Sequence, residues 1–187
     1  MTASPDANPA PTPAPHTPAP YVEPWLSGSR TETPAAGRAV LHALDLAKHD
    51  IEKWIAGLTD EQLNAQPYGL PSIAFHLRHI ARSTDRILTY AEGEQLSDVQ
   101  LAALKAEKGG EAATRAQLLD EIRAAFSSAE SRIRALASAD FDTPRAVGRK
   151  QLPTSVGGAL IHVADHTQRH VGQVVTTAKV LKALAAS

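Results

Sequence analysis

Four long segments of this chain carry apolar residues at the spacing of one face of an α-helix, and this pattern constrains the fold more than any other feature. The segments span about residues 34–57, 71–92, 115–138 and 155–183. In each, apolar residues recur every three or four positions, as on the buried face of an amphipathic helix. No segment alternates apolar and polar residues as a strand does. We therefore expect an all-α chain whose four helices form an antiparallel bundle.

The connections between these segments support a single domain. Thr114 precedes the third segment with Gln117 three residues later, which is the spacing of a capping box. The stretch 94–113 has no clear periodicity, and it is the only connection long enough to cross the bundle. At 187 residues the chain is long enough for one domain with a full core, whereas two domains would each be undersized. We expect the bundle to occupy residues 31–187.

Residues 1–30 differ in composition and are expected to form a proline-rich, extended N-terminal arm. They contain eight of the thirteen prolines. Up to residue 20 they offer too little apolar surface to offset the entropy of ordering. Tyr21, Trp25 and Leu26 are expected to bury enough surface to anchor the end of the arm. The arm has no basic segment followed by an apolar one, so it does not read as a secretory signal, and we expect a cytoplasmic protein.

The composition excludes several classes of function. The net charge is −1, and the basic residues are scattered among the acids, so nucleic-acid binding is not expected. No apolar run approaches the roughly 18 residues that cross a bilayer, which predicts a soluble protein without a membrane span. The chain has no cysteine, so disulfides, thiolate ligands and a cysteine nucleophile are excluded. Any metal must be bound by His, Asp or Glu, which favours a hard or borderline divalent ion.

Two histidines four residues apart, His166 and His170, are the best candidates for metal ligands. On a helix, residues at this spacing project from the same face one turn apart, so their imidazoles can bind one cation. A histidine from the second helix, His76 or His79, would complete a site of three nitrogens. Three protein ligands leave positions open for water or substrate, as in a catalytic metal site. Alternatively, histidines at a core margin form hydrogen bonds with carboxylates or backbone.

Helical phase separates these candidates from the other histidines. His42 and His49 are predicted to point away from the core and to be exposed to solvent. His162 also faces outward, and His16 belongs to the arm. Only the histidines at the edge of the core are therefore expected to bind metal.

Charged residues near the candidate ligands allow two interpretations. Asp85 and Asp165 are candidates to orient the ligands from behind. Four arginines are candidates to surround the entrance and attract an anionic substrate: Arg78, Arg82, Arg86 and Arg169. The alternative is that all six are ordinary solvated charges on the outside of a bundle. The sequence contains no phosphate-binding glycine loop, serine nucleophile elbow or paired-carboxylate motif.

Three sequence motifs resemble those of a known family. They are Leu77-Arg-His79-Ile80 on the second helix, Asp165-His166-Thr-Gln-Arg-His170-Val-Gly-Gln173 on the fourth, and Leu58-Thr-Asp-Glu-Gln-Leu63 after the first. With them the chain resembles the DinB-like superfamily of YfiT-like four-helix bundles over about residues 34–182. The resemblance implies an up-up-down-down bundle and three histidines that hold a divalent ion at one end. Many members look like dimers, which implies a homodimer.

The resemblance also implies which residues bind the metal. The helix-two ligand falls on His79, because the family places it before an aliphatic and a small residue, here Ile80 and Ala81. His76 also precedes an aliphatic residue and remains the alternative. The other two ligands fall on His166 and His170. The motif on the fourth helix adds two further candidates, which would contact the ligands and orient them without binding the metal: Asp165 and Gln173. The metal implied is nickel or zinc, with iron or manganese as alternatives.

The activity that this resemblance implies is a metal-dependent reaction on a small molecule. Our leading hypothesis is the transfer of a low-molecular-weight thiol to an electrophile, since the family includes thiol-dependent S-transferases. Metal-assisted hydrolysis is the enzymatic alternative, and the sequence does not separate the two. The third hypothesis is a non-catalytic dimeric stress-response bundle whose histidines bind metal for stability or bind none.

Overall fold

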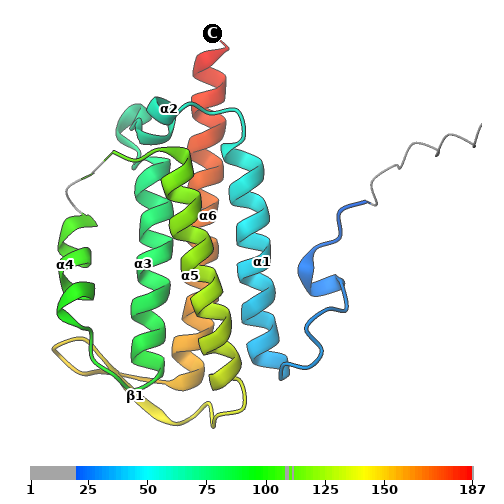
Figure 1. Ribbon diagram of the computed structural model, residues 1–187, viewed down its shortest axis with the longest axis vertical. Coiled ribbons are helices and arrows are strands. Elements are labelled where there is room, and N and C mark those ends of the chain that lie inside the picture. Colours follow the sequence, from blue (N-terminus) through cyan, green and yellow to red (C-terminus); the bar gives the residue numbers. More distant parts are fainter. Residues whose placement is uncertain (1–19, 108–109, 111, 187) are drawn as a thin grey trace, which may run out of the picture.

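Four long helices dominate the computed structural model, which describes residues 20–107, 110 and 112–186 (Figure 1). They are α1 (Ala35–Ile55), α3 (Ile73–Ala91), α5 (Arg115–Leu136) and α6 (Val156–Ala185). Every end lies within two residues of the predicted boundary. The capping box predicted at Thr114 and Gln117 is present. The all-α fold class is therefore confirmed.

The helices run up, down, down and up in chain order (Figure 1). Within the α3–α5 pair, Arg78 bonds Glu121 and Arg132 bonds Asp85, so these two helices are parallel. The expected up-up-down-down order is wrong. The physical reason is the position of the long connection. It lies between α3 and α5 and returns the chain to the end where α3 began, whereas the shorter connections join antiparallel neighbours.

Two short helices were not predicted. α2 (Asp60–Asn64) follows α1 and opens with a capping box between Thr59 and Gln62. α4 (Asp98–Ala106) lies inside the long connection and begins with a capping box between Ser97 and Gln100. α4 is nine residues long and none of them is buried, so its apolar pattern is too short to indicate a packed helix in the sequence. Two 3-10 turns, η1 (Pro24–Leu26) and η2 (Pro67–Gly69), complete the helical elements of the described residues.

A β-hairpin between α5 and α6 was also not predicted. Strands β1 (Pro144–Val147) and β2 (Leu152–Ser155) pair antiparallel, with Pro144 opposite Ser155. Arg145 on β1 donates a hydrogen bond of 2.7 Å to the carbonyl of Ala91 at the end of α3. This bond caps the helix and fixes the hairpin against the end of the bundle. Four-residue strands are too short to show a two-residue period in the sequence.

The core fills the space between the four long helices. Its largest fully buried side chains are aliphatic: Leu41, Ile51, Ile55, Leu63, Ile73, Leu77, Ile80, Leu88, Leu118, Ile122, Ile133 and Leu160. They come from all four helices and from α2, so each helix is held by burial of its apolar face. Among the described residues, no helix has the length and apolar character that crossing a membrane requires.

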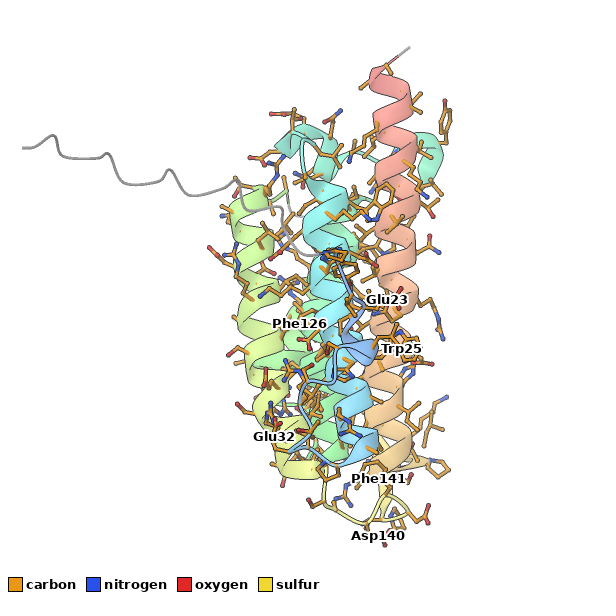
Figure 2. All side chains as sticks on the ribbon, turned by 90° about the vertical axis from the view of Figure 1, so that its right-hand side faces the viewer. Glu23, Trp25, Glu32, Phe126, Asp140 and Phe141 are labelled. Carbon is orange, nitrogen blue, oxygen red and sulfur yellow. The ribbon has the colours of Figure 1, made fainter. Side chains whose placement is uncertain are left out.

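The segment before α1 runs along the outside of the bundle (Figure 2). Tyr21 and Trp25 are 54% and 64% exposed, and Leu26 is also exposed, so the expectation that these side chains anchor the segment by burial is wrong. The anchor is Arg30, whose guanidinium bonds Asp45 of α1 at 2.7 Å and Glu130 of α5 at 2.6 Å. Residues 1–19 of the predicted arm lie outside the described residues.

Candidate metal centre

Three histidines from two helices converge where α3 and α6 cross in opposite directions. They are His79 on α3 and His166 and His170 on α6, and one ring nitrogen of each lies within 4.8 Å of the other two. The centroids of the three rings are 4.5 to 5.0 Å apart. All three side chains are half-buried at the margin of the core, as helical phase predicted. The structure thus brings together the same three residues that the sequence singled out.

His79 is held by a carboxylate from the long connection. Its Nδ1 donates a hydrogen bond of 2.8 Å to Oε2 of Glu107, which directly follows α4. The other carboxylate oxygen of Glu107 accepts from the guanidinium of Arg86 at 2.5 Å. Burial alone would raise the pKa of Glu107, but the hydrogen bonds from His79 and Arg86 outweigh it and hold the pKa below its ordinary value. A carboxylate that stays ionised fixes the proton of His79 on Nδ1.

The two α6 histidines also have partners at Nδ1. The Nδ1 of His166 lies 3.4 Å from the hydroxyl of Ser83, whose own proton goes to the backbone carbonyl of His79. The Nδ1 of His170 lies 3.0 Å from Nδ1 of His76. The remaining nitrogen of His76, Nε2, is buried and has no hydrogen-bond partner among the described residues. His76 therefore supports His170 from behind and is not one of the three converging rings.

This pattern leaves the Nε2 lone pairs of His79 and His166 facing each other, with one ring nitrogen of His170 close to both. The Nε2 atoms of His79 and His166 are 3.3 Å apart. When both rings carry their proton on Nδ1, these two atoms are acceptors and repel each other unless a cation lies between them. Two nitrogens bound to one tetrahedral ion at about 2.05 Å lie about 3.3 Å apart. The donor set and its spacing therefore fit a divalent metal bound by three neutral imidazoles.

The rings are electrostatically prepared to bind a cation. Burial lowers the pKa of His166 and His170 to about 4, and the neighbouring imidazoles add to this effect. The same causes lower the pKa of His76 to about 4. Only a neutral imidazole has a lone pair for a metal, so rings that stay neutral well below pH 7 do not have to lose a proton when the metal binds.

A cavity of about 500 Å³ opens beside the cluster. It lies between α3, the start of α6 and the β-hairpin, and thirteen residues line it: His79, Ser83, Arg86, Ile87, Tyr90, Val147, Thr154, Gly158, Ala159, Ile161, His162, Asp165 and His166. Two of the three converging histidines form part of its wall. The site is thus open on one side to a space large enough for a small molecule.

Several predicted supporting residues have other partners. Asp85 bonds Arg132 and Gln100, and Asp165 bonds His162 at 2.7 Å, so neither orients the three histidines. Gln173 is exposed on α6 and makes no hydrogen bond to the histidines within the described part of the chain.

Only one of the four arginines considered for the entrance reaches the cluster. Arg86 does so through Glu107. Arg169 is exposed and lies 3.6 Å from Asp165. Arg78 and Arg82 line a separate cavity of about 280 Å³ on the other side of Glu107.

The prediction that His42 and His49 are exposed is wrong for His42. Its side chain is only 8% exposed, because the segment before α1 covers it and places the hydroxyl of Ser29 3.3 Å from its Nε2. His49 is partly covered by the ring of Tyr21, which stacks on it at 3.8 Å. Neither of these two histidines is among the three converging rings. His162 is exposed, as predicted.

The fold and the site together define the class of protein. It is a helical bundle that can bind a divalent metal through three histidines beside an open cavity. The family is also established, because the model of the DinB superfamily matches residues 43–174. The chain belongs to the DinB superfamily.

A solved structure shares this fold. It is the crystal structure of a conserved protein from Enterococcus faecalis, with a TM-score of 0.63 and 19% sequence identity. The match covers 78% of this chain and 96% of that one. At this identity the likeness concerns the fold alone. A search of curated proteins found no significant match to the chain.

Proposed function

We propose that this protein is a cytoplasmic metal-dependent enzyme that transfers a small thiol to an electrophile. The metal would be held by His79, His166 and His170, with nickel or zinc preferred over iron or manganese. The observation that carries the proposal is the convergence of one ring nitrogen from each of three histidines beside an open cavity, whose wall includes His79 and His166. A bound divalent ion supplies Lewis acidity there, which lowers the pKa of a thiol or water and so yields a nucleophile near neutral pH.

The surrounding residues support a catalytic rather than a structural site. Glu107, Ser83 and His76 each contact the Nδ1 side of one histidine, so each ring is turned toward the shared space. Such support keeps the ligands in place while substrate enters and leaves. A structural site is closed by a fourth protein ligand, and within the described residues only three histidines converge. The open cavity provides the room that a second substrate requires.

The thiol must come from a small molecule, because the chain contains no cysteine. The electrophile would lie in the cavity against Ile87, Tyr90 and Ile161, whose apolar surfaces exclude water from the reacting atoms. Arg86 is held by Glu107 and lines the same cavity, so it adds positive charge where a thiolate would approach. These residues bind and orient the reactants without themselves forming a bond.

The test begins with the metal and then separates the reactions. Purified protein is incubated with nickel or zinc at pH 7.5, dialysed and analysed for metal, and about one ion per chain is expected. The loaded protein is then assayed with a panel of low-molecular-weight thiols against an alkylating electrophile, and in parallel with ester and amide substrates. Thiol consumption that requires metal supports the proposal, whereas hydrolysis without thiol would identify the metal-dependent hydrolase instead. Protein that binds metal and accelerates neither reaction would be the non-catalytic bundle.

The resemblance to dimeric members of the superfamily leads us to propose a homodimer as well. Sedimentation equilibrium of the metal-loaded and metal-free protein tests this assignment. A mass of one chain under both conditions would contradict it.

A further inference from the structure

A groove separate from the cavity beside the histidines lies between α4 and the β-hairpin. Its volume is about 400 Å³. Leu96, Leu101 and Leu104 form an apolar floor that the rest of the bundle leaves uncovered, and Leu104 is 40% exposed. An uncovered apolar surface inside a groove favours a bound ligand over water.

This groove adjoins the cavity beside the three histidines. Tyr90 lines both, and the hairpin contributes Val147 to the cavity and Gly148 to the groove. Tyr90 follows His79 by eleven residues on α3, which corresponds to about 16 Å along the helix axis. The cavity therefore extends along about three turns of α3, from the histidines to Tyr90, where the groove adjoins it.

The groove carries two cations that lack acidic partners. Lys105 at the end of α4 and Arg149 in the hairpin turn both line it and both are exposed. Neither forms an ion pair within the described ranges, and no acid is among the described residues that line the groove. In contrast, Arg86 and Arg132, which also lie on this side of the bundle, are each paired with carboxylates. Two unpaired cations over an apolar floor form a complementary surface for an anion with an apolar stem.

Both walls of the groove are fixed to α3. The side chain of Gln100 on α4 donates to Asp85 at 2.7 Å and to Thr89 at 2.8 Å. The hairpin is fixed by the bond from Arg145 to the carbonyl of Ala91. A groove whose walls are already held in place loses little entropy when a ligand binds.

We propose that this groove binds the carboxylate end of an elongated thiol substrate, with Lys105 and Arg149 as its specificity determinants. The ligand class is an elongated molecule with a thiol at the histidine end, an apolar middle beside Tyr90 and a carboxylate at the groove. The guanidinium of Arg149 can donate hydrogen bonds to both carboxylate oxygens, and Lys105 adds a second charge. This inference rests on the proposed function, because the position of the thiol comes from the metal site.

The experiment compares two matched peptides that differ in one charge. Both are acetylated and amidated tetrapeptides, Cys-Ala-Leu-Glu and Cys-Ala-Leu-Gln, about 14 Å long when extended. With metal-loaded protein we expect the acidic peptide to have a KM about tenfold lower, with kcat unchanged. The double substitution Lys105→Ala and Arg149→Ala should abolish that preference. Lys150→Ala, which removes the next cation along the hairpin turn, is the matched control and should retain it.

A second pair of peptides, with Ser in place of Cys, measures binding to the groove independently of thiol transfer. Calorimetry measures the binding of these peptides, and thermal unfolding shows that each variant is folded. One outcome is that the serine peptide ending in Glu binds better than the one ending in Gln, while no thiol transfer is detected. The groove would then bind a carboxylate as proposed, and the proposed function would be wrong. Thiol transfer with equal KM for both cysteine peptides would overturn the groove and leave the function intact. An equal loss of the preference for the acidic peptide in Lys150→Ala would also overturn the groove proposal, since the preference would then come from the general positive charge of the surface.

Discussion

The Nδ1 atom of His79 and the Oε2 atom of Glu107 are 2.8 Å apart, although 28 residues separate them in the chain. This hydrogen bond joins a ligand candidate on a long core helix to the residue that follows α4. A carboxylate behind a metal-binding histidine fixes the ring orientation and raises the basicity of the opposite nitrogen. Arg86 holds the same carboxylate, so the three side chains form one connected unit.

The substitution Glu107→Gln is expected to weaken metal binding about 10- to 100-fold. The amide keeps the size of the side chain but loses the negative charge that orients His79 and pairs with Arg86. Competition with a chelator of known affinity measures the change. Glu92→Gln is the matched control, because Glu92 also pairs with an arginine, Arg132, but does not contact the histidines. Equal losses in both variants would contradict the role given to Glu107.

Glu107 could not have been found from the sequence. It lies at the end of a stretch without clear helical periodicity, because α4 is only nine residues long and none of its residues is buried. Nothing in the local sequence shows that the long connection returns this acid to α3. The β-hairpin was missed for a related reason, since its short strands are held by Arg145 and not by an apolar face.

The three converging histidines were predictable because helical phase and a four-residue spacing are local properties. His79, His166 and His170 lie at the margin of apolar stripes that the sequence shows plainly. The same reasoning failed for His42. Helical phase describes only how a residue is placed relative to the core of the bundle. It does not show that the segment before α1 covers the outer face of α1, where His42 lies.

Alanine substitutions should separate the ligands from the other histidines. His79→Ala, His166→Ala and His170→Ala are each expected to abolish tight metal binding. His76→Ala is expected to weaken it without abolishing it, because His76 contacts only the Nδ1 side of His170. Metal analysis after dialysis measures all four.

His42→Ala serves as the control, with unchanged metal content but an unfolding free energy lower by about 1–2 kcal/mol, since this buried ring contacts Ser29. Complete loss of metal in His76→Ala, with binding retained in His79→Ala, would show that the helix-two ligand is His76.

Acidification should destabilise the metal-free protein between about pH 6.5 and pH 4. In the unfolded chain an imidazole has a pKa near 6.5, whereas the folded protein lowers the pKa of His166 and His170 to about 4. Between these values the unfolded chain binds more protons, so stability falls as the pH falls and levels off below about pH 4. Thermal midpoints measured with a chelator present should follow this course. His166→Asn should flatten the slope, and Gln173→Asn, an exposed and uncharged position on the same helix, should retain it. A midpoint that rises on acidification would contradict the assignment.

Removal of residues 1–20 is expected to leave the thermal midpoint and the metal content unchanged. A proline-rich segment with almost no large apolar side chains gains too little from burial to offset about 1–2 kcal/mol of backbone entropy for each ordered residue. Deletion through Ser29 should lower the midpoint, because it uncovers His42 and removes the ring that stacks on His49. A large loss of stability from the shorter deletion would show that the arm packs on the bundle or on a second copy.

Arg30 should account for most of the attachment of the remaining segment. Its guanidinium bonds Asp45 on α1 and Glu130 on α5, two helices that run in opposite directions, and its side chain is 18% exposed. The carboxyl of Glu130 has its pKa lowered to about 2 by the hydrogen bonds from Arg30 and Arg134, so the pair stays charged throughout the neutral range. Arg30→Ala is therefore expected to lower the unfolding free energy by about 1–3 kcal/mol in urea denaturation. Arg123→Ala removes an arginine that, among the described residues, forms an ion pair only with the exposed Asp120, and it should change stability by less than about 0.5 kcal/mol. Equal effects in the two variants would mean that the segment before α1 is held by its backbone and not by the guanidinium.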